Sequence, residues 1–82
     1  MTVEQAKKEA RKRGFIELRP GVWLETGRQA LEDATEEERE AAKFDIDEDG
    51  FYIVTTDGIF DTVMDDDITE IIKQGKAEGF IK

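Results

Sequence analysis

This 82-residue sequence contains no His, Cys, Ser or Asn. Its carboxylates are therefore the first candidates for catalytic or metal-binding side chains. The usual general base and the commonest nucleophiles are therefore missing. If residues 44–64 form three antiparallel strands, Asp45 and Asp61 lie on one face about 10 Å apart, which is two inter-strand spacings. That separation is near the upper end for the carboxylate pair of an inverting glycosidase. We nevertheless expect no enzyme and no catalytic residues, because a chain of this length leaves little room for a deep sugar cleft.

A second chemical pattern has the spacing of the first half of a calcium-binding EF-hand loop. It consists of Asp45, Asp47, Asp49 and Gly50. In such loops acidic residues at positions 1, 3 and 5 supply oxygen ligands, and glycine at position 6 makes the bend. The second half of the pattern is missing, because position 8 is Tyr52 and position 12 is Thr56, where a bidentate glutamate belongs. A calcium loop over residues 45–56 remains an alternative, while our primary expectation is no metal ion and no cofactor.

Length and composition indicate one small α+β domain over residues 1–82, with a core that must be economical. Without cysteine there are no disulfides, and no apolar run has the length of a transmembrane helix or of a signal-peptide core. We therefore expect a cytoplasmic protein that does not contact a membrane. The sequence sets no oligomeric state.

Charge is distributed unevenly along the chain, whose formal net charge is −9. Residues 1–14 hold five Lys or Arg against two Glu, whereas residues 45–67 hold nine acidic residues and no Lys or Arg. Residues 45–67 thus form a field of one sign that repels phosphate groups and attracts basic surfaces.

The segment Phe44–Met64 carries the strongest strand and turn signals. Its Asp-Gly pairs at 49–50 and 57–58 are typical of type I′ hairpin turns. They predict a three-stranded meander in which Ile53 pairs with Thr62. One face of this meander is apolar. The other face collects Asp45, Asp47, Tyr52, Val54, Ile59, Asp61 and Val63.

This second face is half apolar and half acidic. Such a face is either a binding surface or a surface whose apolar centre is covered by a helix, with the Asp residues at the rim.

The flanking segments predict the remaining elements. A capping box at Thr2–Gln5 starts a helix over Val3–Arg13, and residues 15–26 form a hairpin around Pro20-Gly21. Residues 27–43 form either one helix or a short turn followed by a helix from Glu36. An Asp of the triplet at 65–67 caps a last helix that covers the apolar face of the meander.

The predicted fold is therefore α+β in the order α-β-β-α-β-β-β-α. Its antiparallel sheet contains the C-terminal three-stranded meander and the N-terminal hairpin, and the C-terminal helix packs on it.

The acidic field of residues 45–67, together with the apolar residues on the second face of the meander, favours a non-enzymatic module that binds a basic protein partner. Trp23 is either a core residue or a contact residue of that module. The expected partner-binding residues are Asp45, Asp47, Tyr52, Val54, Asp61, Asp65, Asp66 and Trp23. If the bound surface is a nucleic-acid groove, the protein would act as a nucleic-acid mimic, an inhibitor of the kind found in mobile elements.

Two alternatives remain open. The first is an accessory subunit or a nucleic-acid contact through the basic face of the first helix, formed by Lys7, Lys8, Arg11 and Lys12. The second is a structural or assembly subunit. We expect no direct nucleic-acid binding, since nucleic-acid binders usually add base-reading residues and a basic total charge.

Overall fold

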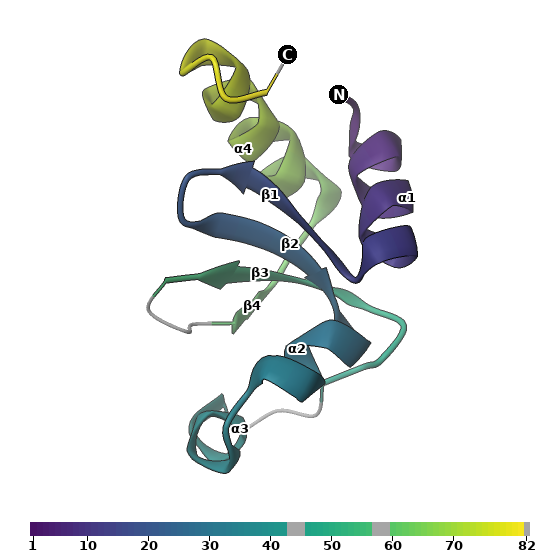
Figure 1. Cartoon of the computed structure of the whole chain (residues 1–82), viewed down its shortest axis with the longest axis vertical. Helices are drawn as coiled ribbons and strands as arrows, with labels where there is room; N and C mark the ends of the chain where they lie inside the picture. Colours follow the sequence, from purple (N-terminus) through teal and green to yellow (C-terminus); the bar gives the residue numbers. More distant parts are fainter. Residues whose placement is uncertain (43–45, 57–59, 82) are drawn as a thin grey trace.

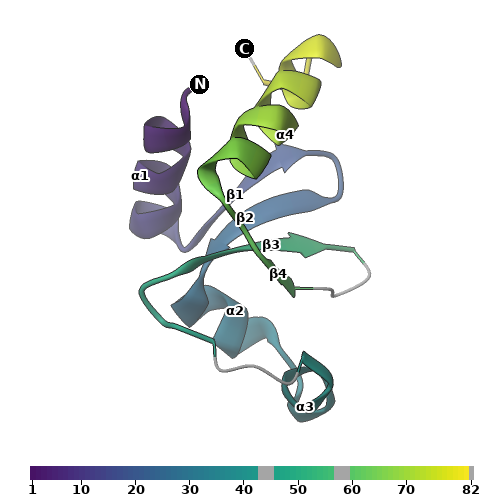
Figure 2. The ribbon, with the colours of Figure 1, turned by 180° about the vertical axis from the view of Figure 1, so that it is seen from behind.

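The sheet and the helices form an α+β arrangement in which helices lie on both sides of one antiparallel sheet (Figures 1 and 2). The computed structural model describes residues 1–42, 46–56 and 60–81. Within them the sheet has the strand order β1-β2-β3-β4. The elements are α1 (Val3–Arg13), β1 (Phe15–Arg19), β2 (Val22–Thr26), α2 (Gly27–Asp33), α3 (Glu36–Ala42), β3 (Phe51–Thr55), β4 (Phe60–Thr62) and α4 (Asp65–Ala77). The expectation of an α+β fold with an antiparallel sheet is confirmed.

Helix α1 begins at the predicted capping box. The Thr2 hydroxyl accepts a hydrogen bond from the backbone N–H of Gln5 at 3.2 Å, and the Gln5 side chain accepts one from the Thr2 N–H at 2.8 Å. The buried positions of α1 are Ala6 and Ala10, which are both fully shielded from solvent. Because these side chains are small, α1 can approach the sheet closely.

The hairpin of β1 and β2 turns at Pro20-Gly21, as predicted. Gly21 has a φ of 80°, which only glycine adopts without strain. The register shifts between Glu17 and Arg19, which is a β-bulge. A bulge increases the local twist, so it lets this turn join two paired strands.

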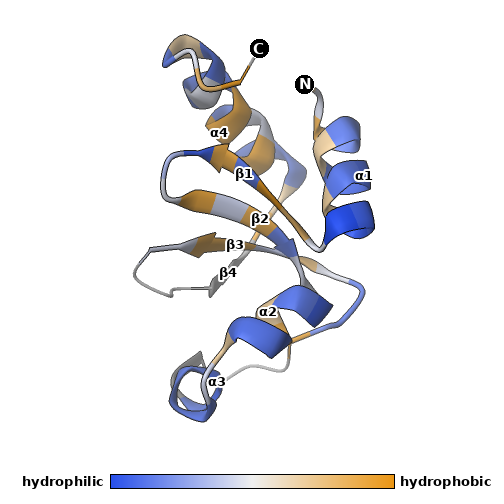
Figure 3. Cartoon of the chain, in the orientation of Figure 1, coloured by the Kyte–Doolittle hydropathy of each residue, from blue (hydrophilic) through white to orange (hydrophobic). Residues whose placement is uncertain are grey.

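One face of the sheet forms the main core with α1 and α4, which lie side by side on it (Figure 1). Alternation along the strands puts Ile16, Leu24 and Ile53 in one cross-strand row. Figure 3 shows apolar residues along the strands and on α4. The buried residues of this core are Ala6, Ala10, Ile16, Leu18, Leu24, Ile53, Ile68 and Ile72.

The prediction of a first meander strand is wrong for the residues of that segment that the structure describes. Residues 46–48 are not in a strand, and Gly50 is not among the glycines with positive φ, so Asp49-Gly50 is not a type I′ turn. The segment docks instead on the start of α2, where the N–H groups of Gly27 and Arg28 donate to the carbonyls of Gly50 and Glu48 at 2.9 and 3.3 Å. The first N–H groups of a helix need such acceptors. Strand β3 therefore pairs with β2.

The second hairpin of the predicted meander is present, but with a different register. Strands β3 and β4 pair Ile53 with Asp61 and Val54 with Phe60, whereas the prediction pairs Ile53 with Thr62. A shift of one residue exchanges the two faces of a strand, so the predicted face that held both Val54 and Asp61 is wrong, because Asp61 pairs with Ile53. The predicted turn at Asp57-Gly58 lies outside the described residues.

After β2 the chain forms two helices, with a separate helix from Glu36 as one of the predicted alternatives has it, and only the cap of the helix after β4 differs from the prediction. Both Thr26 and Thr35 act as caps, since their hydroxyls accept from the N–H groups of Gln29 and Glu38, and residues 27–42 therefore form two helices. The N-cap of α4 is Met64 instead of an aspartate. Its N–H donates to Asp67 at 3.1 Å, so one Asp of the triplet satisfies the helix start from inside the first turn.

Candidate functional site

The sheet face opposite the main core is partly covered by α2. Val54 packs against Ala30 and Ala34 of this helix, and only 6% of Tyr52 is exposed. The hydroxyl of Tyr52 also accepts a hydrogen bond from the backbone N–H of Asp47 at 2.9 Å. Tyr52 and Val54 are thus largely structural residues, and of the two interpretations of this face the structure supports the helix-covered one at its centre.

Beside this covered centre, the same face opens into a cleft of about 450 Å³. Trp23 lies in the middle strand pair, directly opposite Val54 of β3 and next to Glu17 of β1. We call this hollow the Trp23 cleft. It is lined by Phe15, Trp23, Glu25, Gln29, Asp33, Glu38 and Val54.

Glu25 is the most unusual residue of the Trp23 cleft, because it is an acidic side chain that is only 6% exposed. Phe15 and Tyr52 are its direct neighbours on the adjacent strands. Its Oε1 atom is buried and receives no hydrogen bond from the described residues. Burial, repulsion by Asp33 and a hydrogen bond to Asp33 raise the pKa of Glu25 to about 7.

The other polar groups of the Trp23 cleft are fixed by the helix caps. Thr26 caps the start of α2, and Asp33 at the end of this helix lines the cleft together with Glu25 of β2. The Asp33 carboxylate accepts a hydrogen bond from the Gln29 side-chain amide at 3.0 Å. Thr35 starts α3 and hydrogen-bonds the Glu38 carboxylate at 3.2 Å. Among the described residues that line the cleft, the charged ones are all acidic, so no cation of the described lining offsets their negative charge.

Among the remaining predicted acidic contacts, those whose side chains the structure describes lie on two different segments of the chain. Asp47 is exposed, and its side chain accepts from the N–H of Asp49 at 3.0 Å, which fixes the turn before β3. Asp65 and Asp66 are exposed in the first turn of α4, where negative charge complements the helix dipole. Asp45 lies outside the described residues, and for Asp61 the structure describes the strand but not the side chain.

Asp65 has a specific partner in α1, since its carboxylate lies 2.6 Å from the Lys7 ammonium. Asp65→Asn should lower the free energy of unfolding by only about 0.5 kcal/mol, because the Asp65 side chain is 65% exposed and exposed ion pairs are weak. Urea unfolding at low and high salt measures this. A loss above about 1.5 kcal/mol that persists at high salt would contradict a screened surface pair.

Half of the predicted basic face of α1 is engaged within the protein. The cations of Lys7 and Arg11 lie 5.6 and 5.1 Å from the centre of the Phe51 ring, in cation–π geometry. Lys8 and Lys12 are exposed. Arg11 is exposed as well, so of these four residues only Lys7 is partly buried.

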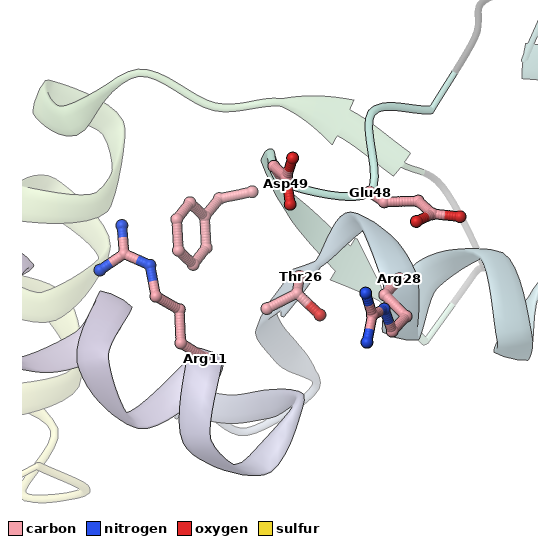
Figure 4. Close-up of a pocket in the computed structure, with 6 residues that line it drawn as sticks. Arg11, Thr26, Arg28, Glu48 and Asp49 are labelled. Carbon is pink, nitrogen blue, oxygen red and sulfur yellow. The ribbon is translucent and has the colours of Figure 1, made fainter.

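A second cleft, of about 380 Å³, lies between α1, α2 and the segment before β3 (Figure 4). Arg11 and Arg28 enter it from the two helices, and Glu48 and Asp49 lie on the segment opposite. Because its charges are of both signs and nearly balanced, this cleft has no strong preference for an anion or a cation.

In the described ranges no three acidic residues are grouped so that they could hold a metal ion. Within the same ranges, every helix is too short or too polar to cross a membrane. No protein-family model, curated protein or solved structure matches this chain.

Sequence reasoning missed Glu25, Asp33, Glu38 and Phe15 as residues of a common site. The alternation in β2 does indicate that Trp23 and Glu25 share a face, because they are two residues apart in a strand. The same alternation predicts an ordinary solvent-facing glutamate, since only the packing of α2 on this face buries the carboxylate.

Proposed function

We propose that the protein is a non-enzymatic interaction module that binds a basic protein surface through the side of the sheet that carries α2 and α3. The observation that supports this most directly is the Trp23 cleft, with apolar and aromatic walls and exclusively acidic charged residues. Aromatic side chains at the centre of an interface supply affinity, and surrounding charges of one sign select a partner of the opposite sign.

The charge around the Trp23 cleft favours the same kind of partner. Residues 27–42 hold six acidic side chains against Arg28 and Arg39. Among them Glu32, Glu36, Glu37 and Glu40 are exposed. Such a field accelerates encounter with a basic protein, while apolar contacts in the cleft slow dissociation. If the basic surface is a nucleic-acid groove, the module would inhibit its partner as a nucleic-acid mimic.

Charge reversal on α3 tests the proposal. The double variant Glu37→Lys/Glu40→Lys should bind a labelled peptide of alternating lysine and glycine about tenfold more weakly than the unchanged protein, because two favourable charge contacts become repulsive. Fluorescence anisotropy at low and at physiological salt measures the affinity. Binding by the unchanged protein should itself weaken with salt.

A matched control changes the net charge equally in another part of the molecule. Glu4→Lys/Glu70→Lys alters exposed residues of α1 and α4. This control should retain most of the binding. Equal losses in the two variants would mean that only net charge matters, and absence of any binding at low salt would refute the proposal.

The alternative of a nucleic-acid contact through α1 predicts a different result. A salt-dependent gel shift that disappears on Lys8→Ala/Lys12→Ala would support it, because these are the exposed lysines of the basic face. An unchanged mobility at low salt would leave the acidic side of the molecule as the interaction surface.

A further inference from the structure

We propose that the Trp23 cleft binds the side chain of an arginine from a basic protein partner, with the guanidinium group beside Glu25 and Asp33 and the alkyl part against Trp23. This inference rests on the proposed function and assigns a specific chemical group to it. Three features carry the assignment: the unsatisfied carboxylate, the uncompensated charge of the lining and the free aromatic ring.

The carboxylate feature is the Oε1 atom of Glu25, which is buried and accepts no hydrogen bond from the described residues. Buried polar atoms normally have a partner, and a carboxylate oxygen requires a donor. Because Asp33 lines the same cleft and acts on Glu25, two acceptor groups lie side by side. A guanidinium group presents several N–H donors in one plane and can bind both carboxylates at once.

The aromatic feature distinguishes guanidinium from ammonium. Trp23 is half-buried, and no cation of the described part of the chain lies over its ring, whereas the Phe15 ring already carries Arg13 at 5.4 Å. Guanidinium groups stack on aromatic faces and are less strongly hydrated than ammonium groups, so they enter a partly apolar cleft at lower cost. Lysine should therefore bind more weakly.

The cleft is suited in size to such a group. At about 450 Å³ it exceeds the volume of one amino-acid side chain, and its apolar lining comes from Phe15, Trp23 and Val54. Long basic side chains pack their aliphatic part against such surfaces while the charged end reaches a polar partner.

Protonation of Glu25 should oppose this binding, because the neutral carboxyl loses the charge that attracts a guanidinium group. The groups that face Glu25 are Asp33 of α2, Glu38 of α3, Tyr52 of β3 and Phe15 of β1 with Arg13 on its ring. The raised pKa of Glu25 means that affinity should increase as the pH rises through about 7.

The test uses N-acetyl-arginine methylamide as the probe, with the citrulline and lysine analogues as comparisons. Trp23 is the only tryptophan of the chain, so its fluorescence reports directly on the cleft. At pH 8 we expect a saturable change with the arginine probe in the millimolar range. The lysine probe should bind at least about fivefold more weakly, and the neutral citrulline probe should give no saturable change.

Variants locate the site. Glu25→Gln and Asp33→Asn should each weaken binding of the arginine probe at least about fivefold, while Glu70→Gln, at an exposed position of α4, should leave it unchanged. Two variants are used so that a folding defect in one does not decide the result.

Equal affinities for the arginine and lysine probes would overturn the arginine assignment, and equal affinities for arginine and citrulline would overturn a charge-based site. If basic peptides bind the protein but the arginine probe leaves Trp23 unaffected, this inference fails and the proposed function stands. If basic peptides do not bind at all, the proposed function fails as well.

Discussion

Gly27→Ala should lower the free energy of unfolding by about 3 kcal/mol. A Cβ atom at this position would lie 1.7 Å from the backbone carbonyl oxygen of Asp47, which is a steric clash. To relieve the overlap, the segment before β3 must move away from α2, and the hydrogen bonds to Gly50 and Glu48 stretch. Alanine favours helix over glycine by up to about 1 kcal/mol, so a loss must come from the contact itself. Thermal and urea unfolding measure the change.

Gly50→Ala is the matched control in the same segment. The nearest atoms to a Cβ at Gly50 lie at 3.4 Å, which is ordinary contact distance, and its φ is not positive. We expect a change below about 1 kcal/mol. If Gly27→Ala were as stable as the unchanged protein, the segment of residues 47–50 would not lie on the start of α2.

Glu25→Gln should raise the free energy of unfolding by about 2 kcal/mol at pH 8 and change it little at pH 4. Burial and Asp33 raise the pKa of Glu25 from 4.5 to about 7, so above pH 7 the folded protein holds a buried charge that the unfolded chain keeps in water. Glutamine is neutral at every pH, and its amide can donate to Asp33 as the protonated carboxyl does. The full pKa difference corresponds to roughly 3 kcal/mol, and water in the open cleft reduces it.

The direction of the pH dependence follows from proton uptake. Between pH 4.5 and about 7 the folded state binds more protons at Glu25 than the unfolded state does. The stability contributed by this group is fully present below pH 4.5 and is lost as the pH rises through about 7. Urea unfolding of both proteins from pH 4 to 8 should give curves that diverge. Parallel curves, or the same divergence in Glu37→Gln, would contradict the buried state of Glu25.

Local elements were predictable wherever neighbouring residues supply the controlling interaction. The capping hydrogen bonds of Thr2, Thr26 and Thr35 span three residues each, and all three form. The turn at Pro20-Gly21 likewise depends on φ values that these two residues set themselves. Helix α1 and the first hairpin therefore followed from short-range chemistry. Of the two alternatives for residues 27–43, the structure has the separate helix from Glu36, but helix α2 precedes it instead of a short turn.

The meander failed because its first turn was assigned from a pair of residues alone. An Asp-Gly pair suits a hairpin turn. Here, however, the carbonyls of Gly50 and Glu48 accept hydrogen bonds from the first N–H groups of α2, and these bonds hold the segment away from a hairpin. Strand β3 then takes β2 as its partner, although even the nearest pair, Thr26 and Phe51, is 25 residues apart in sequence. No local pattern ranks these two pairings, because both place an alternating apolar strand beside β3.

For the candidate site, the sequence by itself determined the charge, the absence of thiol and imidazole chemistry, and the shared face of Trp23 and Glu25. Only the tertiary structure decided that Tyr52 is buried and Val54 packs against α2, that Lys7 pairs with Asp65, and that Glu25 is buried beside Asp33. The physical reason is that charge and side-chain alternation are properties of the chain, whereas burial depends on which distant element packs on a face. The interaction surface that we propose therefore centres on the Trp23 cleft, beside the buried Tyr52.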